Sequence, residues 1–341
     1  MKQSYMAKKI NLLLLQLIIK CGCQIALSFM LVAKIAAQQL PIYSQSIGNQ
    51  FSLNPAYAGH DDAISISGAV RKQWTGLQGS PLTQNINVHL PLYYINSGVG
   101  LAVERDVIGV EENISAAVAY QYTIQLNKTN QLSAGLGIGI MQKTLDGTKL
   151  RTPEGVYEGS SVIHNDVLLQ AGKMSEIAPI THFGIYYTSN KFFGGAVIHN
   201  LIEGNLKYQT NLSLLLKRHY TVYIGYKFNV MEELTLQPSM LYRTLSFGLQ
   251  QIETNIVATY NDKFLIGIGY RGYSALSNDA LIGIIGTKLN ERLSLAYSYD
   301  YTTSPLQTTS NGSHELLLNY KFKPNIGKGK PANIIYNPRF L

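Results

Sequence analysis

Apolar and small polar residues alternate with a period of two along most of the chain after Asp62. In 114–126 every even-numbered residue is apolar or aromatic, and the residues between them are Ser, Ala, Gln or Thr. In 132–140 Leu, Ala and Ile alternate with Ser and Gly. A period of two is that of a β-strand whose two faces meet different surroundings. The pattern therefore predicts an all-β protein.

Fourteen such segments can be counted, and many of them are 10 or more residues long. They are 62–73, 82–92, 97–106, 112–126, 130–143, 177–188, 191–200, 216–229, 232–244, 248–260, 263–272, 278–289, 291–303 and 312–322. A soluble β-sandwich alternates in the same way, but its strands are usually about 5–6 residues long. A tilted strand that crosses a bilayer needs about 9–11 residues. The lengths favour a membrane barrel over a sandwich.

The composition also favours a barrel. Charged residues make up only 14% of the chain, whereas Tyr (23) and Gly (30) are plentiful. The second face of the predicted strands is small and polar, which suits a lumen, and aromatic pairs such as Tyr93–Tyr94 and Phe192–Phe193 lie near strand ends, as interfacial girdles do. Because lipid offers no hydrogen bonds to an open edge, the sheet has to close. We therefore predict a transmembrane antiparallel β-barrel of about 14 strands over 62–322.

The connections between the predicted strands are alternately short and long. The short ones are 93–96, 127–129, 189–190, 230–231, 261–262 and 290, and the longest of the others are 144–176 and 201–215. Outer-membrane barrels have short periplasmic turns and longer external loops. Both ends of the barrel are therefore expected in the periplasm. Pro238 lies inside a predicted strand and lacks a ladder donor, so a bulge or a strand end is expected there.

Residues 1–37 have the features of a cleaved export signal. Lys8 and Lys9 precede a long apolar stretch, and small residues near Ala37 offer a cleavage point. The alternative is a retained membrane anchor, but Lys20 prevents an uninterrupted apolar run of about 20 residues. Both cysteines lie in this segment, at positions 21 and 23. A cleaved chain would have no cysteine for a disulfide, a nucleophile or a metal site.

The net charge of +8 does not predict binding to nucleic acid. Five lysines and no acidic residue lie within 1–37, and removing this segment leaves 23 basic and 20 acidic residues. So small an excess is not the footprint of a protein that binds a polyanion.

No motif of the chain predicts catalysis or a cofactor. Gly267–Gly272 matches G-x-G-x-x-G, but it lies within a predicted strand and no amphipathic helix follows it, as dinucleotide binding would require. Glycines that face a lumen explain the match better. The seven histidines lack the spacing of a metal site. We expect no enzyme, no cofactor and no metal.

Charged residues on the small-polar face are predicted to point into the lumen. They are Arg71, Glu104, Lys227, Arg243, Arg271, Arg292, Asp300 and Glu315. One interpretation is a network of ion pairs that holds the shape of the barrel, and the other is a selectivity lining of a solute pore. The presence of both signs of charge favours the network.

Several short motifs occur in order along the chain: Tyr43–Gln45, Asn54–Gly59, Arg71–Gly76, Gly79–Gln84, Gln237–Ser239, Tyr297–Tyr301, Gly312–Glu315 and Pro338–Phe340. In these motifs the chain resembles the PorP/SprF family of outer-membrane proteins, which serve type IX secretion and gliding motility in Bacteroidetes. The resemblance assigns family-motif positions and possible partner contacts to Asn54, Pro55, Tyr57, Gly59, Arg71, Gln73, Trp74, Pro338, Arg339 and Phe340. Lys72 departs from the family pattern, and Asn337 replaces a frequent Cys, which removes any mechanism based on a tail thiol.

The resemblance implies a non-enzymatic barrel in the cell outer membrane. Its partners would be proteins of the secretion or gliding machinery, or secreted surface adhesins. The alternative is a porin or transporter for small solutes. Residues 38–61 are expected as a periplasmic segment in which Asn54, Pro55 and Gly59 form a turn, lying in the periplasm or folded back into the barrel mouth. Residues 323–341 are expected as a periplasmic tail, either solvated or a docking peptide.

Overall fold

A computed structural model describes residues 40–157, 162–165, 171–209, 212–245, 249–274 and 277–323. The predicted export signal lies outside the described residues. So does the predicted tail after its first residue, including Pro338, Arg339 and Phe340. Within these ranges, no helix is long and apolar enough to cross a membrane.

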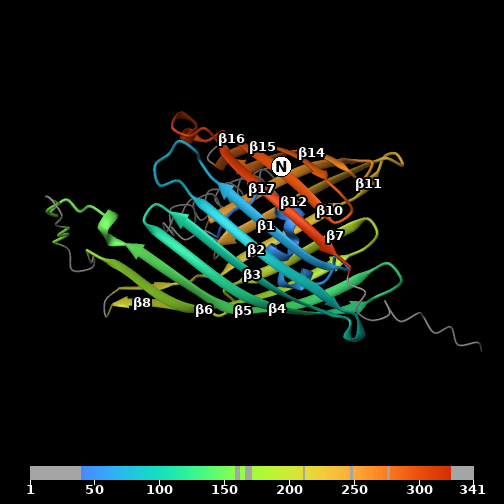
Figure 1. Ribbon diagram of the computed structural model, residues 1–341, viewed down its shortest axis with the longest axis horizontal. Coiled ribbons are helices and arrows are strands. Elements are labelled where there is room, and N and C mark those ends of the chain that lie inside the picture. The colour runs from blue at the N-terminus through green and yellow to red at the C-terminus, as the bar shows by residue number, and fades with distance from the viewer. Residues whose placement is uncertain are drawn as a thin grey trace, which may run out of the picture. The chain divides into compact units, whose positions relative to one another are not determined.

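Fourteen antiparallel strands form the wall of a barrel (Figure 1). They are β1 (Ile64–Lys72), β2 (Leu82–Leu92), β3 (Ser97–Ile108), β4 (Glu111–Gln125), β5 (Gln131–Asp146), β6 (Lys173–Thr188), β7 (Phe192–His199), β10 (His219–Tyr226), β12 (Leu234–Leu245), β13 (Leu249–Tyr260), β14 (Phe264–Ser274), β15 (Ser277–Lys288), β16 (Leu293–Thr302) and β17 (Ser313–Phe322). Each segment predicted from the alternation overlaps one of these strands, although several strands extend beyond the predicted bounds, as β5 and β6 do. The predicted fold class and number of strands are confirmed.

The sheet closes on itself. Each strand pairs with its neighbours in the chain, β10 pairs directly with β12, and β1 pairs with β17 over its whole length. The register of that last pair runs from Ile64↔Phe322 to Lys72↔His314. Closure gives the backbone groups of the first and last strands partners inside the wall, which a bilayer cannot supply.

The two faces of the wall differ as the alternation predicts. Apolar side chains such as Ile86, Val118 and Ile268 are 54–69% exposed on the outside, where lipid would cover them. Polar side chains such as Ser67 and Asn87 are buried on the inside. This arrangement is the reverse of a soluble protein and is that of an outer-membrane barrel.

The connections differ in length at the two ends of the barrel. The long ones, 73–81, 147–172, 200–218 and 303–312, all follow strands that run in one direction. We call that side the long-loop end and the opposite side the short-turn end. By the rule for outer-membrane barrels, we expect the first to face the exterior and the second the periplasm. The predicted connection 144–176 is shorter in the structure because β5 and β6 continue into it.

The connection 200–218 contains a hairpin that the alternation did not predict. It consists of β8 (Asn205–Gln209) and β9 (Leu212–Leu215). Leu206 is fully buried and packs with Leu216 against Ala178 and Ile180 of β6. Strands of four or five residues are too short to span a bilayer, so a count based on spanning length passes over them.

Pro238 lies in a regular part of β12, where its register partner is Ile256 of β13. No bulge occurs there. The interruption lies in the opposite neighbour, where β10 ends at Tyr226 and the two-residue β11 begins at Phe228. This break lies opposite Pro238, which has no N–H to donate to a neighbouring strand.

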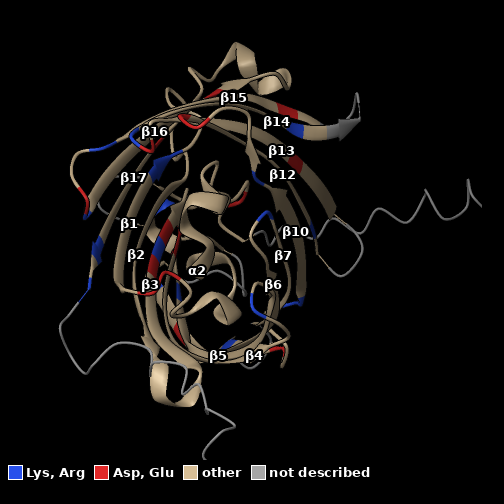
Figure 2. Cartoon of the chain, turned by 90° about the vertical axis from the view of Figure 1, so that its right-hand side faces the viewer, with Lys and Arg blue, Asp and Glu red and all other residues tan. Residues whose placement is uncertain are grey.

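Residues 43–61, which we call the plug, lie inside the barrel. They include two 3₁₀ turns, Ser46–Asn49 and Pro55–Tyr57 (η2), and a single helical turn, α2 (Gln50–Leu53). Figure 2 shows α2 enclosed by the ring of strands. The segment 38–61 was expected in the periplasm or folded back into the barrel mouth. From Tyr43 onward it packs inside the barrel, as the second alternative expects.

Candidate functional site: the plugged lumen

Asn54 fastens the plug to the barrel wall. It is fully buried, and its Oδ1 accepts from the backbone N–H of Ala56 at 2.9 Å, which caps η2. Its Nδ2 donates to the carbonyl of Ile185 at 2.9 Å and lies 3.1 Å from the hydroxyl of Tyr223. Pro55 occupies the first position of η2, where no donor is needed. The Asn-Pro pair is therefore a cap and an anchor at once.

The second half of the same motif turns the chain towards β1. Gly59 has φ +81° and donates its N–H to Nδ1 of His89 at 3.0 Å. The Tyr57 hydroxyl donates to Asp61 at 2.9 Å, and Nε2 of His60 lies 2.8 Å from Oγ of Ser133. Burial lowers the pKa of His60 to about 4, so this ring is neutral at pH 7.

Glycines in the wall make room for the plug. A Cβ on Gly98 would collide with the carbonyl oxygen of Ala58, and one on Gly135 with the backbone nitrogen of Ala56. Both collisions are with backbone, which cannot rotate away as a side chain can. The small residues of the inner face are therefore a fitted surface for the plug.

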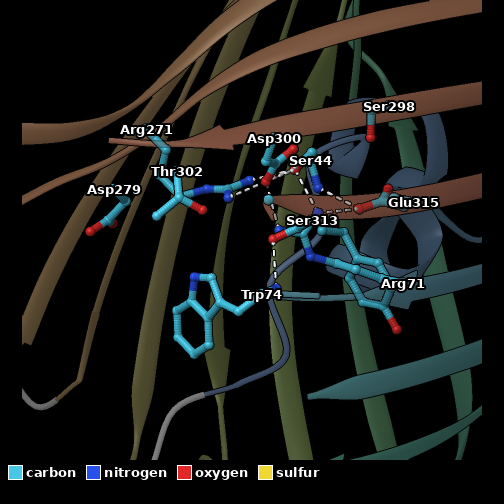
Figure 3. A network of polar contacts seen from close by, with 12 residues as sticks. Ser44, Arg71, Trp74, Arg271, Asp279, Ser298, Asp300, Thr302, Ser313 and Glu315 are labelled. Carbon is cyan, nitrogen blue, oxygen red and sulfur yellow. Dashed lines mark hydrogen bonds and ion pairs between the residues drawn. The ribbon is translucent and has the colours of Figure 1, made fainter. Parts of the chain in front are cut away.

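Ser44 anchors the other end of the plug to a buried charge cluster (Figure 3). Its hydroxyl donates to Asp300 at 2.7 Å and accepts from Nη1 of Arg71 at 2.9 Å and Nη2 of Arg271 at 2.7 Å. Arg71 and Arg271 come from β1 and β14, and Asp300 comes from β16. One hydroxyl thus joins three strands of the wall.

The side chain of Glu315 in β17 binds the backbone of the plug. Its two carboxylate oxygens accept from the backbone N–H groups of Ser44 and Gln45 at 2.7 and 3.0 Å. Arg71 lies 3.2 Å from the same carboxylate. Ser44 and Gln45 form a turn that leads into Ser46–Asn49, and this turn directs two consecutive N–H groups at one carboxylate.

Arg271 links the cluster to a third carboxylate. It contacts Asp300 at 2.8 Å and Glu253 of β13 at 2.7 Å. Glu253 also accepts from Asn255 at 2.9 Å. All the ionised groups of this chain of contacts are almost fully buried. Breaking one member of such a network leaves an uncompensated charge in the interior, which is costly.

Arg243 of β12 completes the balance of charge. It lines the same cavity as Arg71 and Arg271, so three arginines accompany the carboxylates of Glu253, Asp300 and Glu315. Its Nε and Nη2 atoms are buried without a hydrogen-bond partner among the described residues. The cluster as a whole carries no excess of either sign.

The remaining predicted lumen charges lie elsewhere. Glu104 of β3 accepts from the Tyr43 hydroxyl at 2.7 Å and so holds the plug beside the cluster. Lys227 is exposed at the break between β10 and β11, and Arg292 is exposed in the turn between β15 and β16. Neither belongs to the buried network. The alternation fails for them because each lies in a break or turn and not inside a strand.

A cavity of about 830 Å³ lies above the cluster at the long-loop end. Trp74 lines it and has φ +49°, an unusual backbone conformation for a bulky residue. The backbone N–H of Trp74 donates to Oγ of Ser313 at 3.1 Å, and Thr75 donates to the carbonyl of Gly312 at 2.8 Å. Gln73 donates its N–H to Pro81 at 2.9 Å. These bonds clamp the Trp74 backbone in its strained form.

The G-x-G-x-x-G match and most of the histidines lie in the strands of the wall. Gly267–Gly272 lies in β14 and does not join a strand to a helix. His182, His199 and His219 face each other across β6, β7 and β10. In the part of the chain that the structure describes, no group of three or more His, Cys, Asp or Glu side chains is placed to hold a metal ion.

Two residues of the site escaped the sequence reasoning. Glu253 lies in a predicted strand on the same face as Asn255, and strict alternation would have placed it in the lumen. Ser44 belongs to a family motif, but nothing in the sequence places it beside Asp300, which is 256 residues away. Only the tertiary fold brings the charged partners to this serine.

Comparison with known proteins gives one family. A family model described as "Type IX secretion system membrane protein PorP/SprF" matches residues 35–320. No curated protein matches the chain.

Solved structures that resemble the chain include outer-membrane channels. The toluene transporter TodX of P. putida is 9% identical, with a TM-score of 0.48, over 80% of this chain and 93% of that one. A FadL homologue of Pseudomonas aeruginosa is 13% identical, with a TM-score of 0.46, over 79% and 93%. The monoaromatic hydrocarbon channel CymD is 10% identical, with a TM-score of 0.45, over 84% and 94%.

Proposed function

The chain belongs to the PorP/SprF family of type IX secretion membrane proteins, and on that premise we propose that it is a non-enzymatic docking barrel of the outer membrane. It binds proteins of the secretion or gliding machinery, or secreted adhesins that stay at the cell surface. The observation that carries the proposal is the plug. A lumen whose plug is fastened to the wall from Ser44 to His60 serves recognition better than passage of solutes.

The long-loop end supplies the surface for such docking. Exposed apolar side chains in its connections include Leu77, Val156, Ile163 and Ile202, which are 37–66% exposed. Scattered apolar residues on loops that a rigid wall supports are common in recognition surfaces. Partners from the cell exterior would meet these loops first. Partners in the periplasm would meet the short turns.

Crosslinking in living cells tests this role. A photo-crosslinking residue at Ile202, at the long-loop end, and one at Asn127, at the short-turn end, should each give defined adducts with type IX secretion components or secreted surface proteins. Ile138, on the lipid face of β5, is the matched control and should give none. Adducts that are the same at all three sites would contradict specific docking.

Conductance separates the porin alternative. The purified barrel in a planar bilayer should show little steady conductance, because the plug occupies the lumen. A stable open pore of porin size in the unmodified chain would defeat the docking-only role.

A further inference from the structure

Arg243 differs from the other two arginines of the lumen cluster in its contacts. Arg71 and Arg271 each contact Asp300, at 2.7 and 2.8 Å. Among the described residues, no carboxylate lies within 4.0 Å of the Arg243 guanidinium, and its Nε and Nη2 atoms are buried without a hydrogen-bond partner. These two atoms form one edge of the guanidinium, and such an edge can pair with both oxygens of a carboxylate. The charges of the cluster balance in number, but the ion pairs are unevenly shared.

Arg243 lies where two spaces of the lumen meet. It lines the cavity of about 830 Å³ at the long-loop end, which we call the outer cavity, and also the space of about 160 Å³ between plug and wall. As a whole its side chain is only partly buried. Because no described residue holds the Nε and Nη2 edge, rotation about the outer bonds of the side chain can turn that edge towards either space. A small molecule in the outer cavity can therefore reach it without displacing the plug.

Two histidines bring further nitrogen atoms to the narrower space. Nδ1 of His182 and Nε2 of His199 are buried without a hydrogen-bond partner in the described part of the chain, and both residues line this space with Arg243. The centroids of the two imidazole rings lie 5.2 Å apart. An imidazole can carry its N–H on either nitrogen, so each ring can donate there. Three side chains thus offer donors to one space.

The carboxylates that border the two spaces have other partners. The contacts are 2.7–3.2 Å long and join Asp300 and Glu315 to Arg71, Glu104 to Tyr43, and Asp279 to Gln251. Turning one of these carboxylates towards Arg243 would break a contact that it now makes. The described chain therefore does not supply a counter-ion for Arg243 without losing another pair.

We propose that Arg243 binds the carboxylate of a ligand that enters the outer cavity from the long-loop end. The inference goes beyond the docking role, since a free organic acid can supply this group without any partner protein. A cation in the interior without a paired counter-charge is costly. Water can accept from the Nε and Nη2 edge but cannot compensate the charge, whereas a carboxylate does both in one bidentate contact. Its single negative charge also matches a single unpaired guanidinium.

Crystallography locates the ligand. Crystals of the barrel soaked with 4-bromobenzoate should show the anomalous signal of bromine in the outer cavity, with the carboxylate oxygens at Nε and Nη2 of Arg243. The amide 4-bromobenzamide has nearly the same shape and no charge, so it should leave no signal there. Density for water alone at Arg243 in the crystals soaked with 4-bromobenzoate would overturn the proposal.

Fluorescence measures the affinity, because Trp74 is the single tryptophan of the chain and lines the outer cavity with Arg243. At constant ionic strength, butyrate should shift the Trp74 emission with saturation, and butyramide should not. Arg243→Gln should weaken the binding of butyrate about tenfold or more. Arg243→Lys keeps the charge without the two-atom edge and should give an intermediate affinity. Lys227→Gln removes an equal charge from an exposed position between β10 and β11, so it is the matched control and should leave the affinity unchanged.

Arg243→Gln should still fold, because it removes no ion pair among the described residues, and heat-modifiable migration checks this. If it does not fold, butyrate against butyramide in the unmodified chain and the soaked crystals still decide. Equal responses to butyrate and butyramide would overturn the assignment, as would a response to inorganic phosphate with none to butyrate. An affinity for butyrate that folded Arg243→Gln leaves intact would overturn it as well.

Two capped peptides distinguish the sources of the carboxylate. A saturable response to Gly-Glu-Gly and none to Gly-Gln-Gly, in addition to the response to butyrate, would assign the site to acidic side chains as well as to free acids. A response to butyrate alone would restrict it to free acids. The crosslinks at Ile202 report on docking separately. If they persist while no carboxylate binds, the docking function stands and only this site is excluded.

Discussion

The two halves of the lumen are built in opposite ways. The lower half, towards the short-turn end, holds the packed plug. A space of only about 160 Å³ lies there between plug and wall. The upper half, towards the long-loop end, contains a cavity of about 830 Å³ next to a layer of paired charges. Leu40 and Arg243 border both spaces. The difference shows that one barrel can be sealed and still keep a concave surface at one end.

The wall residues explain the difference. In the lower half, glycines such as Gly98 and Gly135 let the plug backbone approach the strands. In the upper half, the long side chains of Arg71 and Arg271 both reach Asp300 and form a layer of paired charges. Small wall residues leave room for the plug backbone, whereas long ion-paired residues occupy the space beside the wall themselves.

The largest expected effect comes from breaking this layer of paired charges. Asp300→Asn removes the carboxylate that both Arg71 and Arg271 contact and leaves two buried cations short of a partner. We expect a loss of about 3–5 kcal/mol in the free energy of unfolding. Urea unfolding of the detergent-folded barrel, followed by its heat-modifiable migration, measures it. Glu104→Gln, whose main contact is the Tyr43 hydroxyl, serves as control and should cost much less.

A smaller effect should follow from crowding the lower half. Gly135→Ala places a methyl group against the Ala56 backbone nitrogen and should destabilise the plug by about 1–3 kcal/mol. Hydrogen exchange of residues 46–61 should rise while that of the barrel strands stays unchanged. Gly68→Ala is the matched control, since nothing lies within 4 Å of its added Cβ. Equal exchange in the two variants would contradict a tightly fitted plug.

The wall was predictable from the sequence because its signal is local. Alternation over a strand reports which face meets lipid, and a span requires a minimum length, so all fourteen strands could be counted. The plug gave no such signal. Its residues 43–61 form single turns whose stability comes from contacts such as Asn54 with Tyr223, 169 residues away.

The charge cluster was predictable in part for the same reason. Arg71, Arg271, Asp300 and Glu315 lie inside regular strands, so alternation placed them in the lumen. Their pairing depends on closure of the barrel, which brings β1 beside β17. Sequence alone could indicate a network of both signs but not the hydroxyl of Ser44 at its centre.

A third variant separates the cap from the rest of the plug. Asn54→Ala removes the acceptor of the Ala56 N–H and the donor to Ile185. Loss of an N-cap costs typically about 1 kcal/mol. Proteolysis of the folded barrel should become faster within 43–61, and the denaturant midpoint of the wall should shift little. Asn54→Ser keeps a neutral acceptor for the cap and should restore part of the protection. A wall destabilised as much as the plug would show that the two do not unfold separately.

The smallest effect concerns pH and the lower half alone. The pKa of buried His60 is about 4, below the ordinary value of 6.5, so the released plug takes up a proton that the docked plug does not. Stability from this group is complete above pH 6.5 and is lost as the pH falls towards 4. At pH 6 the loss is below about 1 kcal/mol. Hydrogen exchange of 46–61, corrected for the intrinsic rate, should therefore rise modestly between pH 7.5 and 6.

The control for this effect has to keep the hydrogen bond and remove the titration. His60→Gln can still pair with Ser133, and it should flatten the part of the pH dependence that His60 contributes. His89, Asp61 and Lys321 lie nearby and keep their own contributions, so the comparison is between the two chains at each pH. A pH dependence of exchange that is the same in His60→Gln as in the unmodified chain would show that His60 does not couple the plug to pH.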